Sequence, residues 1–465
     1  MKTIIVWFKT DLRLHDNETL VKAIAQGEAI VPIYCFDDSH FVESEYGFQK
    51  TGSFRAQFLL ESLTDLDKNL RKLGSGLVIL RGKPEVEIPK IVSQYRANKV
   101  VAKREVAFEE RQTESKVQEA LFKLKCEFQS FSTSTLYHAE DLPFSIKDIP
   151  DVFTNFRKKT EKDATIRASF ESPVQIKLPS IETTIFPTMK ELGLNFQQID
   201  PRAAISFKGG ESKAIERLNH YFFETNCISN YKETRNGLIG EDYSSKFSAW
   251  LALGCISPRF IYRELKKYET QFGANDSTYW LVFELLWRDY FRFMMKKHQS
   301  KFFQPSGIKH SKIRKVNNDT QKLQDWIEGT TGIDFVDSNM IELKLTGFMS
   351  NRGRQNVASY LCNDLKLDWR LGAAYFEEQL IDYDVCSNWG NWAYLAGVGT
   401  QLSYVPGDAL LSNLTRFIQY EIVTGGLVWD LGRAITTSAL ILLTGTALTA
   451  TLRRAATRAG VGRNT

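Results

Sequence analysis

The stretch TIIVWF (Thr3–Phe8) decides the fold class, because a continuous apolar run of this length is typical of a strand buried on both faces of a sheet. Similar short runs follow as IVPIYCF (30–36), GLVIL (76–80) and KVVAK (99–103). Segments with helical periodicity separate these runs from one another. Strands that alternate with helices predict a doubly wound parallel sheet, with helices on both faces, over residues 1–135.

The rest of the chain divides into three further segments. Residues 136–206 are irregular and rich in proline, serine and threonine, which predicts a connector between domains. Residues 207–399 have helical periodicity, so the fold class is α/β followed by an all-α domain. Residues 400–465 are an atypical tail, in which the uncharged run 434–452 is long enough to cross a membrane. Its six threonines lower the hydropathy, so we expect a buried or amphipathic apolar helix there rather than a membrane helix.

The composition narrows the classes of function only slightly. A net charge of +5 is too small to establish a nucleic-acid partner. The six cysteines are scattered without a CxxC pair, and the N-terminus turns polar too early for a signal peptide, so we expect reduced thiols and a cytoplasmic protein. The two common phosphate-binding glycine motifs are absent, and we expect no metal site. The aromatic fraction of 12% makes an aromatic ligand worth considering.

The stretch IDYDVCSNWGNWAYLAGVG (381–399) holds the densest group of chemically useful side chains. Two carboxylates, two amides and two indoles fall within its first twelve residues, which suits neither a strand nor an ordinary surface helix. Arg354, in FMSNRGRQNVASYL, is able to pair with Asp382 or Asp384 and lower the pKa of that carboxyl. A buried ion pair is costly unless its other hydrogen-bonding groups are used, and a heteroaromatic ligand would use them.

Three more segments carry side chains that suit binding. In FELLWRDYFRF, Glu284, Trp287 and Arg288 share one helix face, although a salt bridge beside a core tryptophan is the commoner meaning of such a pattern. Serines before the helical run FSAWLALG suit a phosphate. The lysines of MMKKHQSKFFQPSGIKHSKIRK, interleaved with Phe302 and Phe303, suit either a phosphate backbone or an ordinary solvated face.

In this order and spacing the segments resemble the photolyase/cryptochrome family over about residues 1–399. The blocks that carry the resemblance are WFKTDLRLHDNETL, SSKFSAWLALGCISPR, FELLWRDYFRF, FMSNRGRQNVASYL and KLDWRLGAAYFEEQLIDYDVCSNWGNW. Within the family, TLYHAEDLPFSIKDIPDVFTNFRKKTE together with Gln355 and Tyr394 resembles the DASH-type cryptochromes. The tail after Gly399 does not resemble the family, which leaves open a frameshift or a fusion.

The resemblance implies a non-covalently bound FAD. Asn388 would face the flavin N5, Asp382 and Asp384 would border the ring, and Arg354 and Asn351 would lie close by. The resemblance implies further FAD contacts from Tyr231, Ser244, Ser245, Lys246, Phe247, Ser248, Glu284 and Arg288. The cofactor carries the redox chemistry in such a protein, and the side chains tune it.

The resemblance also implies a substrate and an electron route. Glu284 would hydrogen-bond a lesion base and Trp287 would stack on a pyrimidine dimer that is flipped out of the DNA, with Gln355 and Tyr394 near the DNA. Trp392 and Trp369 match the first two members of the family's tryptophan electron chain. The third position is Val316, so a neighbouring aromatic such as Trp326 is a candidate to replace it.

A second chromophore is expected from the same resemblance. The DASH branch implies an antenna folate, 5,10-methenyltetrahydrofolate, with Glu109 or Glu110 and Asn155 as contacts.

Three functions follow from these patterns. The first is light-driven repair of cyclobutane pyrimidine dimers by a monomeric photolyase-type enzyme, preferably in single-stranded DNA. The second is a blue-light photoreceptor that signals through the flavin redox state without repair. The third is a defective hybrid whose tail associates with a membrane.

Overall fold

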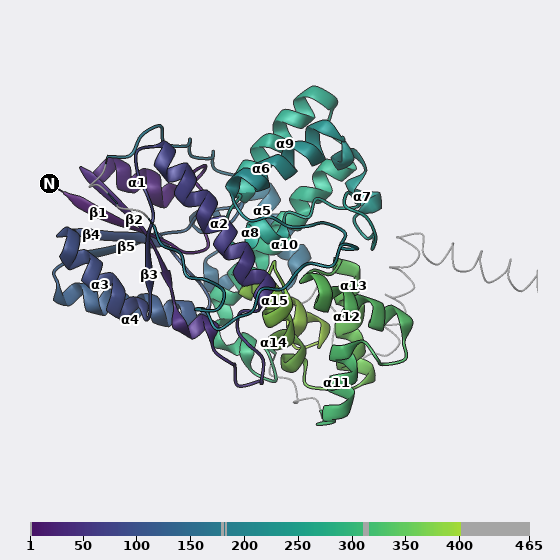
Figure 1. Ribbon diagram of the computed structural model, residues 1–465. Coiled ribbons are helices and arrows are strands. Elements are labelled where there is room, and N and C mark those ends of the chain that lie inside the picture. The colour runs from purple at the N-terminus through teal and green to yellow at the C-terminus, as the bar shows by residue number, and fades with distance from the viewer. Residues whose placement is uncertain (1, 178–180, 182–183, 310–315, 401–465) are drawn as a thin grey trace, which may run out of the picture. The chain divides into compact units, whose positions relative to one another are not determined.

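The computed structural model describes residues 2–177, 181, 184–309 and 316–400 (Figure 1). Among these residues, five parallel strands form one sheet in the order β3-β2-β1-β4-β5. The strands are β1 (Thr3–Phe8), β2 (Ala29–Phe36), β3 (Val78–Arg81), β4 (Lys99–Lys103) and β5 (Glu127–Phe131). The four predicted runs are strands, and the predicted parallel sheet is confirmed. The edge strand β5 was missed because its sequence, EFQSF, lacks a continuous apolar run.

Helices cover both faces of the sheet, as the alternating pattern predicts (Figure 1). They are α1 (Glu18–Gln26), α2 (Ser53–Lys72), α3 (Pro84–Tyr95) and α4 (Phe108–Lys123). Successive residues of β1 point to opposite faces. Ile4 and Val6 belong to one core with Leu20 of α1, and Ile5 belongs to a second core with Val117 of α4. The sheet is therefore buried on both sides, which explains the unbroken apolar run of β1.

The predicted connector contains one element that sequence reasoning missed. Helix α5 (Phe153–Asp163) lies within it, together with the short 3-10 turns η2 (Ala139–Asp141) and η3 (Ile146–Asp148). The carboxylate of Asp289 accepts the amide N–H groups of Leu136 (2.9 Å) and Tyr137 (2.8 Å), which fixes the start of the connector. Complete burial raises the pKa of Asp289 to about 7.

The rest of the described chain is helical, as predicted. Its α-helices are α6 (Glu211–Asn219), α7 (Tyr231–Thr234), α8 (Ser248–Ala252), α9 (Pro258–Phe272), α10 (Asp276–His298), α11 (Thr320–Glu328), α12 (Asp334–Thr346), α13 (Asn351–Ser359), α14 (Trp369–Gln379) and α15 (Val385–Leu395). Short 3-10 and π turns accompany them: η1 (Asp38–Phe41), η4 (His220–Glu224), η5 (Cys227–Asn230), η6 (Gln299–Phe303) and η7 (Tyr360–Asp364). Helix α10 is central, because it packs against α5, α7, α9 and α15.

A buried polar network joins the loop after β1 to the helices. Glu211 accepts the amide N–H of Leu14 (2.9 Å) and that of His15 (3.0 Å). Arg259 donates to Asp16, and the exposed fractions of these two side chains are 5% and 0%. These contacts give the motif DLRLHDN a structural role, because its charged side chains find their partners in the helical part.

Two expectations remain, one for the tail after residue 400 and one for the domain boundaries. The apolar helix predicted at 434–452 lies outside the described residues. Within the part of the chain that the structure describes, no helix has the length and apolar character needed to cross a membrane. The boundaries at 135, 206 and 399 stay predictions.

Candidate functional site

The stretch 381–399 forms a buried helix rather than a surface one. Asp384 caps α15, because its carboxylate accepts the amide N–H of Ser387 at 2.8 Å. Asn388, Trp389 and Trp392 on this helix are all buried. The weak surface-helix propensity of the sequence did not prevent a helix, since tertiary packing supplies most helix stability in proteins.

Helices α14 and α15 fix the side chains that face each other. The Asn388 Nδ2 donates to the Ala373 carbonyl at 2.9 Å, so the amide oxygen is the end left to accept a hydrogen bond. Trp392 packs directly on Gly372, where a Cβ atom would overlap the indole. Trp369 lies three residues before Gly372 on the same helix face.

Arg354 and Asp382 form the ion pair that the sequence predicted as one of two possibilities. The Arg354 Nη2 lies 2.9 Å from the Asp382 Oδ2, and its Nε donates to the Met349 carbonyl at 2.9 Å. The Asp382 side chain is only 2% exposed. Its second oxygen, Oδ1, is buried and has no hydrogen-bond partner in the structure. A buried oxygen of this kind is costly to leave unsatisfied, so it indicates a donor from a ligand.

Lys246 lies near the Arg354–Asp382 ion pair. Its residue is buried, and its Nζ has no hydrogen-bond partner. The ammonium lies 3.3 Å from the centre of the Tyr243 ring and 5.1 Å from that of Phe348. Burial, together with the nearby guanidinium groups of Arg217 and Arg354, lowers the pKa of Lys246 to about 7, although the charge of Glu342 opposes this shift. We call Tyr243, Lys246, Glu342, Arg354 and Asp382 the Lys246 cluster.

Arg217 of α6 holds the loop that carries Lys246. Its guanidinium donates to the carbonyls of Ser245 and Ser244, each at 3.1 Å, and to the Asp242 carboxylate at 2.7 Å. Sequence reasoning missed this residue, since an arginine inside the helical segment ESKAIERLN carries no local signal. Of the predicted phosphate contacts, Ser245 and Phe247 are buried, whereas Ser248 is exposed.

Glu284 and Tyr231 meet at the contact between α10 and α7. The Glu284 carboxylate pairs with Arg235 at 2.5 Å, and the Arg235 guanidinium lies 4.5 Å from the Trp280 ring. Enclosure raises the pKa of Glu284, although Arg235 opposes the shift. Tyr231 is buried, and burial followed by the charge of Glu284 raises the pKa of its hydroxyl. Arg235 was missed because it lies 49 residues from Glu284 in the chain.

Trp287 is half-buried and already stacked on one side. The ring of Phe153, from α5, lies parallel to it with 3.6 Å between the centroids and 12° between the planes. The ring of Phe291 lies 5.4 Å away. Phe153 therefore covers one face of the indole that the sequence assigned to a lesion base.

Arg288 and Asp384 take different roles. The Arg288 guanidinium donates to the carbonyls of Ser134 (2.5 Å) and Leu251 (3.1 Å), so it ties the segment after β5 to the end of α8. Burial acts to raise the pKa of Asp384, but Arg288, Arg292 and the Ser387 amide together hold it below the ordinary value.

The remaining predicted positions lie toward the surface. Asn351 begins α13 and is exposed, and Gln355 on the same helix accepts from Arg352 at 3.3 Å. Tyr394 is half-buried near the end of α15. Phe302 is fully buried, which contradicts the idea that it alternates with lysines along a bound strand. Lys312, Arg314 and Lys315 of that segment lie outside the described residues.

The comparisons with known proteins agree with this arrangement. Family models described as "DNA photolyase" and "FAD binding domain of DNA photolyase" match residues 4–176 and 280–413. A cryptochrome DASH of Gloeobacter violaceus is 49% identical over 399 residues, which are 86% of this chain and 80% of that protein. A cryptochrome DASH of Xenopus laevis is 51% identical over 403 residues, 86% of this chain and 77% of that protein. The crystal structure of a Synechocystis cryptochrome has a TM-score of 0.83 at 48% identity and covers 87% of this chain and 84% of that one.

The chain belongs to the photolyase/cryptochrome family. Its relatives place it with the DASH cryptochromes, and its matched FAD-binding domain makes it a flavoprotein. The Lys246 cluster fits this cofactor on its own chemistry. A buried ammonium without a partner suits a phosphate, and a buried carboxylate oxygen without a partner suits a donor on the ring or the sugar.

The tryptophans of this flavoprotein form two contacting pairs. The rings of Trp392 and Trp326 lie 6.2 Å apart, and those of Trp369 and Trp389 lie 5.8 Å apart. Trp326 is fully buried, and its indole N–H donates to the Val357 carbonyl at 3.0 Å. Val316, at the third position of the expected electron chain, is 40% exposed. Trp389 is one of the two indoles noted in the stretch 381–399, but the sequence analysis gave it no role in electron transfer.

A separate cavity of about 740 Å³ lies between the carboxyl ends of β1 and β2 and helices α4, α10, α14 and α15. Its lining includes Trp7, Tyr34, Glu109, Glu110, Tyr383 and Trp389. The two predicted antenna glutamates are therefore both at this cavity. Asn155 is exposed on α5 and is not among the lining residues, so the structure does not bring it to them.

Proposed function

We propose that this chain repairs cyclobutane pyrimidine dimers in DNA in a light-driven reaction, preferably in single strands. When bound, FAD supplies the light absorption and the electron that such a reaction needs. Family membership implies DNA binding, and the choice of lesion and strand belongs to the proposal.

The observation that carries the proposal is the arrangement of Glu284 and Trp287 on one face of α10. Glu284 holds a carboxylate beside the Arg235 guanidinium, and its oxygens are able to accept a hydrogen bond from the ring N–H of a base. Trp287 offers the indole surface that Phe153 leaves uncovered. A lesion in a single strand needs no base pair to be broken, so the limited stacking surface favours single-stranded DNA.

The Asn388 amide and the Arg354–Asp382 pair support the cofactor end of this proposal. Asn388 would hold its oxygen toward the flavin, because the Ala373 carbonyl fixes its Nδ2. Arg354 would hold the buried Asp382 carboxylate in place by their ion pair. Lys246 would bind an FAD phosphate as a charge-assisted donor.

The test is repair of a dimer-containing oligonucleotide under blue light, as a single strand and as a duplex. We expect the wild type to restore the single strand faster than the duplex. Trp287→Ala and Glu284→Gln should lose most of the repair. Tyr279→Ala changes an exposed aromatic side chain of the same helix and should retain it. Repair that is equal in the wild type and Trp287→Ala would contradict the proposal.

The photoreceptor function has one structural observation in its favour, the stacking of Phe153 on Trp287, which reduces the surface open to a base. A protein that is fully photoreduced yet restores no dimer in either substrate would select this function. Light-dependent binding of a partner would then be the next measurement.

The large cavity supports a proposal for the antenna folate. Its aromatic lining suits a pteridine ring, and Lys9, Lys50 and Arg55 at the cavity suit the carboxylates of a folate tail. The compartment stays a prediction, because a relative of Arabidopsis thaliana is named "Cryptochrome DASH, chloroplastic/mitochondrial".

A further inference from the structure

The electron route of this chain has no tryptophan at its third position. Val316 occupies it, and an aliphatic side chain is not oxidised by a tryptophan radical. A charge that reaches Trp369 must therefore leave through another aromatic ring. Two branches of ring contacts start from the Trp392–Trp369 region, one through Trp326 and one through Trp389.

The branch through Trp326 ends inside the protein. The Trp326 ring contacts Tyr375 at 5.7 Å, and Tyr375 is 4% exposed. Burial raises the pKa of the Tyr375 hydroxyl. A tyrosine that is oxidised must release its phenolic proton, and this hydroxyl has little access to water. Among the described residues, this branch therefore ends at a buried tyrosine.

The branch through Trp389 leads toward the surface. Trp389 lies three residues from Trp392 on α15, and its ring is 5.8 Å from that of Trp369. The next ring is Tyr46, at 6.1 Å from Trp389 and tilted by 48°. Tyr46 is half-buried and belongs to the loop between η1 and α2.

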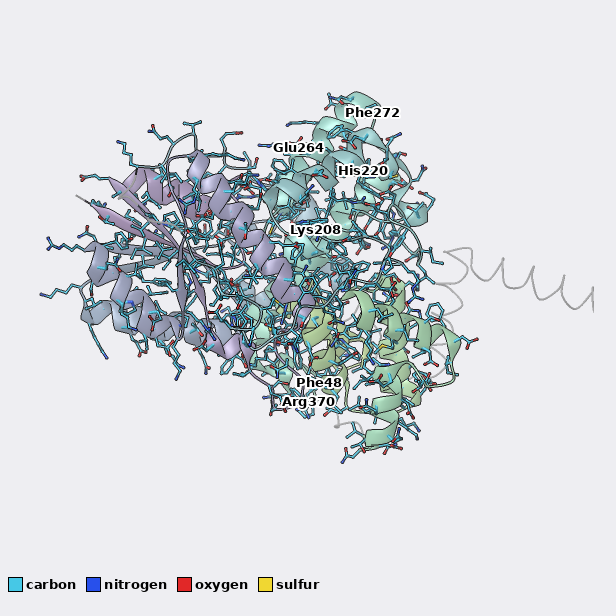
Figure 2. The ribbon with its side chains drawn as sticks, in the orientation of Figure 1. Phe48, Lys208, His220, Glu264, Phe272 and Arg370 are labelled. Atoms are coloured by element: carbon cyan, nitrogen blue, oxygen red, sulfur yellow. The ribbon has the colours of Figure 1, made fainter. Side chains whose placement is uncertain are left out.

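The loop of Tyr46 is held against α14. Phe48 in this loop contacts Tyr375 of α14 at 5.5 Å. Figure 2 labels Phe48 and also Arg370, which belongs to the same helix as Tyr375. The Arg370 guanidinium lies 5.6 Å from the centre of the Tyr46 ring. The positive charge of Arg370 disfavours a positive charge on the Tyr46 ring. Oxidation of Tyr46 is therefore coupled to loss of its proton. Burial raises the pKa of the Tyr46 hydroxyl to about 12, but the adjacent Glu45, an exposed carboxylate, hydrogen-bonds this hydroxyl and is able to take its proton to water.

We propose that Tyr46 is the terminal electron donor of this chain, reached from Trp369 through Trp389. This inference rests on the light-driven reduction of the bound flavin. Trp392 would supply one electron when the bound flavin is excited by light. Trp369 would then reduce Trp392, Trp389 would reduce Trp369, and Tyr46 would reduce Trp389. Tyr46 loses one proton to water and becomes a neutral radical. An external thiol then returns one electron and one proton to it.

The test uses the full chain with bound FAD and electron paramagnetic resonance after a light flash. In the wild type, the late donor radical should have a tyrosyl spectrum that narrows when the protein contains ring-deuterated tyrosine. Tyr46→Phe should lose this spectrum and keep its FAD. Trp389→Phe should lose it as well, since it removes the connecting ring.

Two matched variants examine the other branch. Trp326→Phe and Tyr375→Phe change aromatic rings that contact the same pair of helices and should keep the tyrosyl spectrum. Its loss in Tyr375→Phe, or its persistence in Tyr46→Phe, would overturn the assignment. So would a wild type whose late radical responds only to deuterated tryptophan.

Different outcomes refute the role of Tyr46 and the repair function. Repair by protein whose flavin is reduced chemically with dithionite does not use the donor branch, so Tyr46→Phe should repair like the wild type under that condition. A tyrosyl spectrum without any repair would refute the repair function alone. Repair without a tyrosyl spectrum would refute the role of Tyr46 alone.

Discussion

The Lys246 cluster and the large cavity are both polar regions lined by aromatic rings, but their charges are satisfied differently. In the cavity, Glu105 pairs with Arg292 at 2.8 Å and Lys9 pairs with Glu114 at 2.5 Å. In the cluster, the Lys246 Nζ and the Asp382 Oδ1 have no partner. The ion pairs of the cavity are therefore made without a ligand, and among its described lining residues only the Arg55 Nε is buried without a partner, whereas the cluster leaves both an ammonium and a carboxylate oxygen without one. We infer that FAD contributes to the stability of the fold and that the antenna chromophore is dispensable for it.

The largest expected effect is that of Arg354→Ala. It leaves the Asp382 carboxylate buried without its cation, and removing one partner of a buried pair costs about 3–5 kcal/mol. We expect the flavin-to-protein absorbance ratio to fall to the background value and the Tm to drop. The matched control is Arg352→Ala on the same helix, whose exposed guanidinium contacts only Gln355 among the described partners. If Arg354→Ala keeps its FAD, the cluster is not the cofactor site.

The next largest effect is expected in the pH dependence of the free energy of unfolding, which reflects the titration of Lys246. Its folded pKa of about 7 lies below the ordinary value of 10.5, so between these pH values the unfolded chain binds more protons than the folded one. The free energy of unfolding of the apoprotein should therefore rise with pH in this window, by at most about 1.4 kcal/mol per unit. A phosphate beside the ammonium would restore its charge and flatten the slope.

The measurement is urea unfolding at several pH values, with and without FAD. Lys246→Met removes the titrating group, so the slope should be smaller in its apoprotein than in the wild-type apoprotein. An equal slope in both would show that Lys246 does not titrate in this range.

The contrast between the Lys246 cluster and the large cavity also explains which features could be predicted from the sequence. Lys246, Arg354 and Asp382 of the cluster were predicted because they fall in short blocks, such as FMSNRGRQNVASYL and IDYDVCSNWGNW, which carry their own spacing and charge pattern. Tyr243 and Glu342 were not predicted. The Arg354–Asp382 pair was anticipated as one of two pairings, and the structure selected Asp382. The strands of the sheet were visible for the same reason, since each is a local apolar run.

The residues that sequence reasoning missed act across long separations. Phe153 stacks on Trp287 from a helix in the predicted irregular connector, and Tyr46 contacts Trp389 from a loop beside the sheet. No periodicity within either segment encodes such a contact. The lining of the cavity likewise comes from the ends of strands, loops and several helices. Of its residues, Glu109 and Glu110 were suggested by resemblance as antenna contacts, and Asp384 was suggested as a flavin contact.

Glu110→Gln should affect the cavity without affecting the flavin. Burial, followed by the charges of Glu105 and Glu109, raises the pKa of Glu110 to about 7 from 4.5. Between these values the folded state binds more protons than the unfolded one, so this carboxyl reduces stability as the pH rises through the window. The variant should lose the near-ultraviolet antenna band, keep its FAD, and gain on the order of 1 kcal/mol at neutral pH. Loss of FAD together with the antenna band would contradict the separation of the two regions.

The smallest effect is expected from Glu109→Gln, one residue away. The Glu109 side chain is 68% exposed and pairs with Lys50 at 2.6 Å, and exposed pairs of this kind contribute at most about 1 kcal/mol. Its amide retains an acceptor for Lys50, so the Tm, the FAD content and the antenna band should stay close to the wild type. Spectra of both variants, reconstituted with the same folate, provide the comparison. If Glu109→Gln loses the antenna band and Glu110→Gln retains it, the exposed carboxylate is the folate contact and the enclosed one is a structural residue.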